Sequence, residues 1–166
     1  MNIFYLDTNP HIAAKYMGDK HVVKMILETA QLLSTAHHVS EIRNAFFDLV
    51  HLDDIYKPTH RNHPCAVWVR ETAGNYGWAY NHFCGLLMEY THRYEKHHAS
   101  ERLLMPLAHI PRSTFGPFKE PPLCMPDEYK IGNAVESYRN YYRHAKQNIH
   151  SWKNRNPPEW LMENKE

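Results

Sequence analysis

The stretch "DKHVVKMILETAQLL", residues 19–33, decides the fold of this 166-residue chain. At 100° per residue its apolar side chains fall within one arc, which predicts an amphipathic helix packed against a core. Asp19 precedes the apolar run and is expected to cap this helix at its N-terminus. The residues of the apolar arc are Val22, Val23, Ile26, Leu27, Ala30 and Leu33.

A line of polar residues runs along the same helix, on the face opposite the predicted core. His21, Lys24, Glu28, Gln31 and Thr35 share an arc of about 80°. Such a line is often a solvated face, on which Lys24 and Glu28 form an ordinary i,i+4 pair. It also holds the parts of an active site, because a carboxylate on a rigid helix can act as a general base or stabilise developing positive charge. A lysine or a chain-terminal amine could form a Schiff base there. Spacing alone leaves both interpretations open.

The composition excludes several classes of protein. The chain carries 19 basic and 18 acidic residues, so it is not a strongly basic nucleic-acid binder, and any DNA contact must come from a local patch. Its 3 cysteines form no C-x-x-C pair, which argues against a disulfide framework and a thiolate zinc site and favours a reducing, cytoplasmic compartment. The sequence predicts neither a signal peptide nor a membrane-spanning segment.

The pattern of the whole chain predicts an all-α fold. We expect a compact single domain over residues 1–160, followed by a frayed charged tail at residues 161–166. The opening "NIFYLD" is expected to form a short strand or an extended arm. Prolines cluster between residues 107 and 129, which predicts a long ordered loop. The other expected helices are 11–17, 41–52, 65–94 and 133–152.

A second group of polar residues lies in "THRNHPCAVWVR", residues 59–70, where Pro64 suits the first turn of a helix. The N–H groups at a helix start lack helical partners and favour anions, so Arg61 with His60 and His63 makes a reasonable phosphate site. An ordinary helix cap is the equal alternative. The residues of this group expected to contact nucleic acid are Arg61, Asn62, Trp68 and Arg70.

A third group lies in "YRNYYRHAK", residues 138–146. Arg139, Arg143 and Lys146 are spaced at i, i+4 and i+7, which makes a basic ridge beside several tyrosines. Basic ridges flanked by aromatic rings suit a nucleic-acid backbone with unstacked bases. They are also common on solvated helix faces, so this group is weak by itself.

The 14 histidines raise the possibility of a metal site. Three pairs invite this interpretation: His37–His38, His60/His63 and His97–His98. None matches the H-E-x-x-H motif, and the histidines are spread over the whole chain. We therefore predict no metal and no cofactor, and keep a histidine-based metal-dependent enzyme as an alternative.

Two motifs together resemble those of the pyrimidine-dimer DNA glycosylase superfamily, of the endonuclease V type. Asp19, Lys24, Glu28 and Gln31 fall at the matching places of a Glu-bearing helix motif. Asn62, His63, Pro64 and Trp68 match or nearly match a second motif built around "NHP". The stretch "YRNYYRHAK" is similar to an aromatic and basic stretch near the C-terminus of a phage member. The resemblance covers about the first hundred residues and this short piece.

The resemblance implies a compact helical DNA-binding fold and base-excision chemistry. It implies that a glutamate stabilises the sugar cation while a chain-terminal amine attacks C1′, and Glu28 is the residue to which this role is carried. His21, Lys24 and His63 are expected to assist it or to hold phosphate. The family exposes a small second residue as its new N-terminus, whereas Asn2 does not favour removal of Met1. The remaining residues expected to bind DNA are Lys20, Gln31, Arg139, Arg143 and Lys146.

The leading hypothesis is therefore a DNA N-glycosylase, with or without lyase activity, that acts on a damaged or modified pyrimidine. If Met1 is retained, its own amine, Lys20 or Lys24 would serve as the nucleophile; without lyase activity, Glu28 would activate water. The alternative is a non-catalytic protein that binds a nucleotide or nucleic acid. The oligomeric state is left open. The central expectation is that Glu28 faces a pocket beside the segment of His63 rather than bulk solvent.

Overall fold

The computed structural model describes residues 1–40, 50–112 and 114–162, and within these residues the chain forms six α-helices and no strand. The all-α prediction is confirmed. Short 3-10 turns connect the helices, at Leu52–Asp54, Ala99–Leu103, Asp127–Tyr129, Gln147–Ile149 and Glu159–Leu161. The α-helices are α1 (Pro10–Tyr16), α2 (Asp19–His38), α3 (Pro64–Glu71), α4 (Ala73–Tyr94), α5 (Leu104–Leu107) and α6 (Ala134–Ala145).

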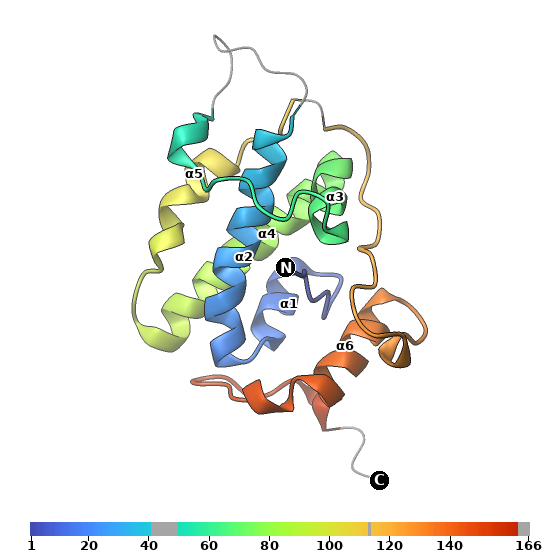
Figure 1. Cartoon of the computed structure of the whole chain (residues 1–166). Coiled ribbons are helices and arrows are strands. Elements are labelled where there is room, and N and C mark those ends of the chain that lie inside the picture. The colour runs from blue at the N-terminus through green and yellow to red at the C-terminus, as the bar shows by residue number, and fades with distance from the viewer. Residues whose placement is uncertain (41–49, 113, 163–166) are drawn as a thin grey trace.

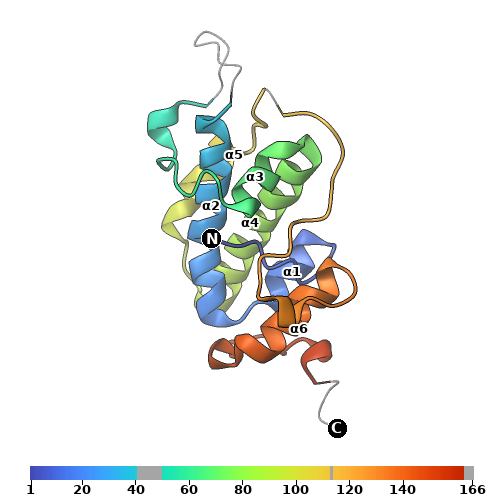
Figure 2. The same ribbon diagram turned by 45° about the vertical axis from the view of Figure 1, so that its right-hand side comes forward.

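The two long helices, α2 and α4, pack against each other at the centre of the molecule (Figure 1). α3 packs against both of them, and α1 packs against α4. Gly85 on α4 allows α1 to come close, because an added Cβ would lie 3.1 Å from Cβ of Ala14. α6 lies at the end of the molecule near α1, so the C-terminal segment closes the core there. This arrangement leaves the middle of α2 beside the N-terminus of the chain in both views (Figures 1 and 2).

The first six residues form an irregular buried arm rather than a strand. Ile3, Phe4, Tyr5 and Leu6 are all buried, and Phe4 has a φ of 52°. The side chain of Asn2 shapes the arm, because its Oδ1 accepts hydrogen bonds from the N–H groups of Ile3 (2.7 Å) and Phe4 (3.3 Å). Of the two forms expected for this segment, the structure adopts the extended arm.

Several predicted helix boundaries are wrong. Residues 65–94 form two helices, because Thr72 is extended and its Oγ1 accepts a hydrogen bond from Asn75 N, which starts α4 afresh. Gly18, and not Asp19, precedes α2; the carboxylate of Asp19 is used elsewhere. The last helix ends at Ala145, well short of residue 152. Most of the helix predicted for residues 41–52 lies outside the described residues.

The proline-rich loop is ordered over its described residues and crosses the start of α4. A Cβ added at Gly74 would lie 2.2 Å from Phe118 N, so only glycine permits this crossing. The loop is held by hydrogen bonds from Trp68 Nε1 to the Lys119 carbonyl (2.8 Å) and from Lys119 N to Asn75 Oδ1 (2.7 Å). The loop thereby reaches the N-terminal arm.

A buried guanidinium connects four segments. Arg93 at the end of α4 has no exposed surface and pairs with Asp19 (3.1 Å) and Glu89 (3.0 Å). It also donates to the carbonyls of Lys15 (3.0 Å) and Met17 (2.7 Å), which end α1. The C-terminal segment joins the network, because Arg155 binds Glu89 (2.6 Å). The start of α2 is therefore fixed by charge as well as by apolar packing.

Replacement of Arg93 by Met should lower the free energy of unfolding by about 3–5 kcal/mol, because two buried carboxylates each lose one charged partner. Lys119→Met, which breaks an exposed pair with Glu71, is the control and should cost no more than about 1 kcal/mol. Urea unfolding followed by circular dichroism measures both. Equal losses in the two variants would contradict the central role given to Arg93.

Candidate active site

The polar line of α2 is largely covered by other segments of the chain, although Lys24 within it is 68% exposed. His21 Nδ1 lies 3.2 Å from the hydroxyl oxygen of Tyr142 on α6. At the other end of the helix, Thr35 Oγ1 accepts from the N–H of Thr59 (3.1 Å). Between them, Glu28 meets the first residue of the chain. His21, Glu28 and Thr35 are thus covered positions, and the prediction that this whole face lies opposite the core is wrong.

The buried arc of α2 is correspondingly rotated from the predicted one. Val22, Ile26, Ala30 and Leu33 are buried as expected, and Met25, Thr29 and Leu32 are buried with them. Val23 and Leu27, predicted to lie in the core, are 37% and 41% exposed. The rotation follows from the arm and α6, which cover the side of α2 that the periodicity assigned to solvent.

The centre of the site is the contact between the terminal amine and Glu28. The amine nitrogen of Met1 lies 3.6 Å from Oε2 of Glu28, and Lys24 Nζ lies 3.3 Å from Oε1. The Glu28 side chain is 15% exposed, whereas that of Lys24 is 68% exposed. The carboxylate is therefore held between two amines, that of the half-buried Met1 and that of Lys24, which is open to solvent. A partly buried carboxylate with an adjacent amine can stabilise a cation and exchange a proton with the amine.

His63 approaches this centre from the start of α3. Its Nδ1 accepts a hydrogen bond from Cys65 N (3.1 Å), so it caps the helix that Pro64 opens. Partial burial and the positive terminal amine lower the pKa of His63, while the negative charge of Glu28 opposes that effect. His63, Glu28 and the amine therefore lie within electrostatic range of one another, but the lining of the nearby cleft does not include Glu28, so the expectation that Glu28 faces a pocket stays a prediction.

His21 is buried and remains neutral in the folded protein. It is 5% exposed, and burial together with the positive charges of Lys146 and Lys24 lowers its pKa to about 3. Gly18 N donates to the Tyr142 hydroxyl oxygen (2.8 Å), which leaves the Tyr142 O–H able to donate to His21 Nδ1. A neutral imidazole cannot supply the positive charge for phosphate that the sequence analysis envisaged. Its role is to position α6 against α2.

A basic cleft opens on the surface beside His21. Its volume is about 200 Å³, and it brings together the first and third polar groups of the sequence. Lys146 reaches it from the end of α6 and lies with Nζ 5.6 Å from the centre of the Phe4 ring. Three ammonium groups around one cleft make a suitable seat for a phosphate. The lining residues are Phe4, Lys20, His21, Lys24, Lys146, Asn148 and Ile149.

The "NHP" group is divided between the surface and the core. Arg61 and Asn62 are exposed, and Arg70 donates to the Arg61 carbonyl (2.7 Å). Trp68 is 3% exposed and its indole nitrogen is bonded to the proline-rich loop. Its ring is part of the core, so Arg61, Asn62 and Arg70 are the members of this group placed to meet a ligand. Gln31 is partly buried, one turn beyond Glu28.

The two arginines of α6 are engaged inside the protein. Arg139 pairs with Asp7 (3.0 Å) and donates to the Leu6 carbonyl (2.8 Å), so it holds the end of the arm. Arg143 donates to the Trp160 carbonyl (2.6 Å). Only Lys146 of the predicted ridge faces the basic cleft. The three residues of the ridge thus lie in different places. Arg139 holds the arm, Arg143 holds the C-terminal segment and Lys146 lines the cleft.

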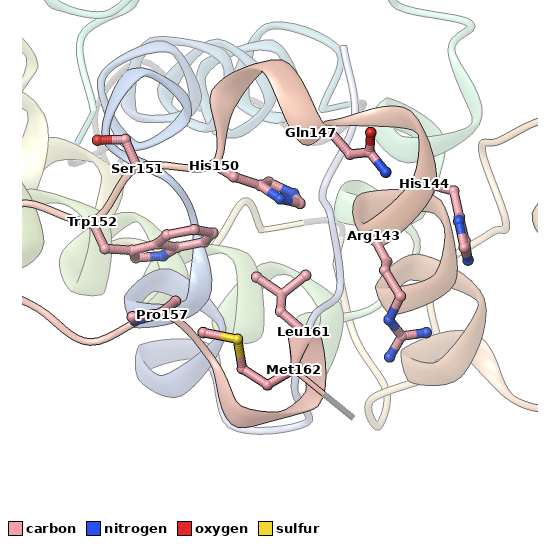
Figure 3. A pocket seen from close by; sticks show the side chains of 9 residues that line it. All are labelled: Arg143, His144, Gln147, His150, Ser151, Trp152, Pro157, Leu161 and Met162. Carbon is pink, nitrogen blue, oxygen red and sulfur yellow. The ribbon is translucent and has the colours of Figure 1, made fainter. Parts of the chain in front are cut away.

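Arg143 also lines a larger hollow of about 600 Å³ in the C-terminal segment. Figure 3 shows Trp152, Leu161 and Met162 gathered around it, with Arg143 and His144 on the neighbouring turn of α6. The lining contains no residue of α2, so this hollow is separate from the carboxylate of Glu28.

Cys65 and Cys124 are neighbours that the sequence did not predict. They lie 59 positions apart in the chain, yet their sulfur atoms are 3.5 Å apart, directly behind His63. The "HPC" arrangement of His63 and Cys65 was the one available signal, since it places two potential ligands two residues apart. Nothing in the sequence pointed to Cys124, because the proline-rich loop has no periodicity from which a position can be read.

Comparison with known proteins identifies one family. The sequence model described as pyrimidine dimer DNA glycosylase matches residues 1–102, which contain Met1, Glu28 and His63. No curated protein and no solved structure matches the chain. Within the described residues, no helix combines the length and apolar character needed to cross a bilayer.

The low pKa of His21 predicts an acid-sensitive fold. Unfolded histidine takes up a proton near pH 6.5, whereas folded His21 does so only near pH 3, so stability is complete above about pH 6.5 and declines as pH falls below it. His21→Asn should flatten this decline by up to about 1.4 kcal/mol per pH unit, as measured by urea unfolding between about pH 7 and pH 4. His144→Asn, at an exposed position, should leave the slope unchanged. An NMR titration of His21 with a midpoint above about pH 5 would contradict the assignment.

Proposed function

Since the chain belongs to the pyrimidine dimer DNA glycosylase family, we propose that it cleaves the N-glycosidic bond of a damaged or modified pyrimidine in DNA, with Glu28 as the key carboxylate. The observation that carries the proposal is the contact of 3.6 Å between the amine of Met1 and Glu28. An amine and a partly buried carboxylate at this distance, beside a basic cleft, are the groups that base excision through an imine would use.

The proposed reaction begins with the neutral amine of Met1. Its nitrogen lone pair forms a bond to C1′ while the electron pair of the glycosidic bond leaves with the base, which takes up a proton. Glu28 accepts a proton from the attacking amine, and its negative charge stabilises the positive charge that develops on the sugar. Opening of the sugar ring, with the proton on Glu28 passing to O4′, then gives an iminium between the chain and C1′. Water hydrolyses this iminium, or a proton is lost from C2′ and the 3′-phosphate leaves. The elimination would constitute the lyase activity.

The surrounding residues suit substrate binding. Lys24 holds the second carboxylate oxygen and lines the cleft, so it connects the reacting centre with the phosphate-binding surface. Lys20 and Lys146 complete the basic lining, and a phosphate seated there would place the adjoining sugar near α2. The target base must leave the duplex to reach a carboxylate that is 15% exposed, at a cost of a few kcal/mol that is smallest for a damaged base.

The decisive test uses ultraviolet-irradiated duplex DNA and duplexes that carry single modified pyrimidines. Wild-type protein should release the base and give an adduct that borohydride traps, whereas Glu28→Gln should lose activity on the order of 100-fold or more. Glu71→Gln, which alters a surface pair with Lys119, is the matched control and should retain full activity. Salt-dependent binding without product on any substrate would instead support a non-catalytic binding protein.

Peptide mapping of the trapped adduct identifies the nucleophile. The proposal places the adduct on the peptide that begins with Met1, and an adduct on Lys20 or Lys24 would replace the amine in the mechanism. Intact mass spectrometry of the same preparation shows whether Met1 is present. A variant with one extra residue before Met1 should lose trapping even though every side chain of the site is retained.

The basic cleft predicts a specific change in salt dependence. Lys146→Met should weaken binding to all duplexes alike and reduce the slope of log K against log salt by about one unit, because one phosphate contact is lost. Lys57→Met is the control, because Lys57 lies far from the cleft. Its neighbour Tyr56 contacts His38 at the C-terminal end of α2, whereas Lys20 of the cleft lies at the other end. A normal slope in Lys146→Met, measured by fluorescence anisotropy, would remove the cleft from the DNA-binding surface.

A further inference from the structure

Three potential metal ligands from two distant segments meet behind the active centre. His63 and Cys65 come from the start of α3, and Cys124 comes from the proline-rich loop. One ligand atom from each lies within 4.8 Å of the other two, and the two sulfur atoms are 3.5 Å apart. Among the residues that the structure describes, these three form a group of His, Cys or carboxylate side chains that lie close enough together to bind one ion.

The donor set points to zinc. Two thiolates and an imidazole are soft and borderline ligands, which favour Zn²⁺ over Mg²⁺ or Ca²⁺. Two sulfur atoms bound tetrahedrally to zinc at about 2.3 Å lie roughly 3.8 Å apart, so the observed separation of 3.5 Å needs an adjustment of only a few tenths of an ångström. We propose that His63, Cys65 and Cys124 bind one Zn²⁺ ion, a site that the glycosylase chemistry does not use.

Access and local geometry agree with such a site. Cys65 is fully buried, whereas His63 and Cys124 are partly exposed, so an ion can arrive from the side of the latter two. The Nδ1 lone pair of His63 now accepts from Cys65 N. Coordination through Nδ1 replaces that hydrogen bond, and coordination through Nε2 requires a proton on Nδ1 and also ends it. In both cases the helix cap of α3 is exchanged for a metal bond, and the ring stays neutral.

The position of the cluster indicates what the ion does. Asn2, which shapes the N-terminal arm, donates from Nδ2 to the Cys124 carbonyl (2.8 Å), and its Oδ1 lies 3.8 Å from Cys65 Sγ. The hydroxyl of Tyr138 lies 3.0 Å from the same Oδ1. An ion at the cluster would join α3 to the proline-rich loop directly beneath Asn2. It would thereby hold the arm whose first amine contacts Glu28.

The same two thiols could be joined by oxidation, and the experiment separates the two states. A disulfide between Cys65 and Cys124 removes both sulfur ligands, so it abolishes zinc binding. Binding is therefore measured on the reduced full-length chain, with free thiols counted beforehand.

The test titrates reduced, metal-free protein with Co²⁺ and then with Zn²⁺. Wild type should bind one Co²⁺ with a thiolate-to-cobalt charge-transfer band and the visible bands of a tetrahedral site, and one equivalent of Zn²⁺ should displace it. Cys124→Ser and Cys65→Ser should weaken Zn²⁺ binding by more than about tenfold, since loss of even an outer partner costs that much. Cys84→Ser is the matched control, because Cys84 lies on α4 beside Tyr80 and outside the cluster.

A second measurement guards against unfolded variants. Zn²⁺ should raise the thermal midpoint of wild type and of Cys84→Ser but not that of Cys124→Ser, whose circular dichroism shows whether it is folded. Absence of a thiolate band in reduced wild type, or equal affinity in folded Cys124→Ser, would overturn the proposal. All these readouts are independent of DNA cleavage, so failure of the zinc site and failure of the proposed glycosylase activity are distinguishable.

Discussion

The burial of a charged guanidinium constrains the rest of this structure. Arg93 has no contact with water, so its charge is tolerable only while Asp19, Glu89 and two main-chain carbonyls surround it. Those groups belong to the end of α1, the start of α2 and the end of α4, which must therefore meet at one point. Asp19 also accepts from Ser151 Oγ (2.8 Å) and Lys153 N (2.9 Å), which brings the C-terminal segment to the same place. Once the start of α2 is fixed, so is the orientation of Glu28, nine residues further along a rigid helix.

The site forms because segments from both ends of the chain cover a face of α2 that would otherwise be exposed to solvent. The arm brings a main-chain amine to Glu28, and α6 brings Tyr142 to His21 and Lys146 to the cleft. A carboxylate between Met1 and Lys24 is partly removed from water but not closed off, which strengthens its interaction with charge while leaving access to solvent. The same covering makes His21 an uncharged packing group. The extent of burial therefore distinguishes Glu28, which solvent reaches, from His21, which it does not.

Periodicity predicted the helical class, and several elements, from local information. Pro64 in the first turn of α3 is confirmed, and the helix predicted at 11–17 is found one residue earlier, at Pro10–Tyr16, because their signals are contained in a few neighbouring residues. The prediction for the polar face of α2 was wrong because such a face has the same sequence pattern whether water or another segment of the chain covers it. Thr72 was missed as a break because its capping hydrogen bond to Asn75 outweighs a helical pattern that continues on both sides. Motifs led us to expect Glu28 near His63, and the two are close enough to interact electrostatically. The contact of Cys65 with Cys124 depends on a loop path that no local rule determines.

The family match ends at residue 102, but the arm is held largely by residues beyond it. Cys124 and Tyr138 bind Asn2, and Arg139 binds Asp7 and the Leu6 carbonyl. A fragment cut at that boundary would carry every atom of the proposed chemistry and still lack the walls of its active site. Its apolar arm would lack these contacts, so residues outside the matched region also position the amine of Met1.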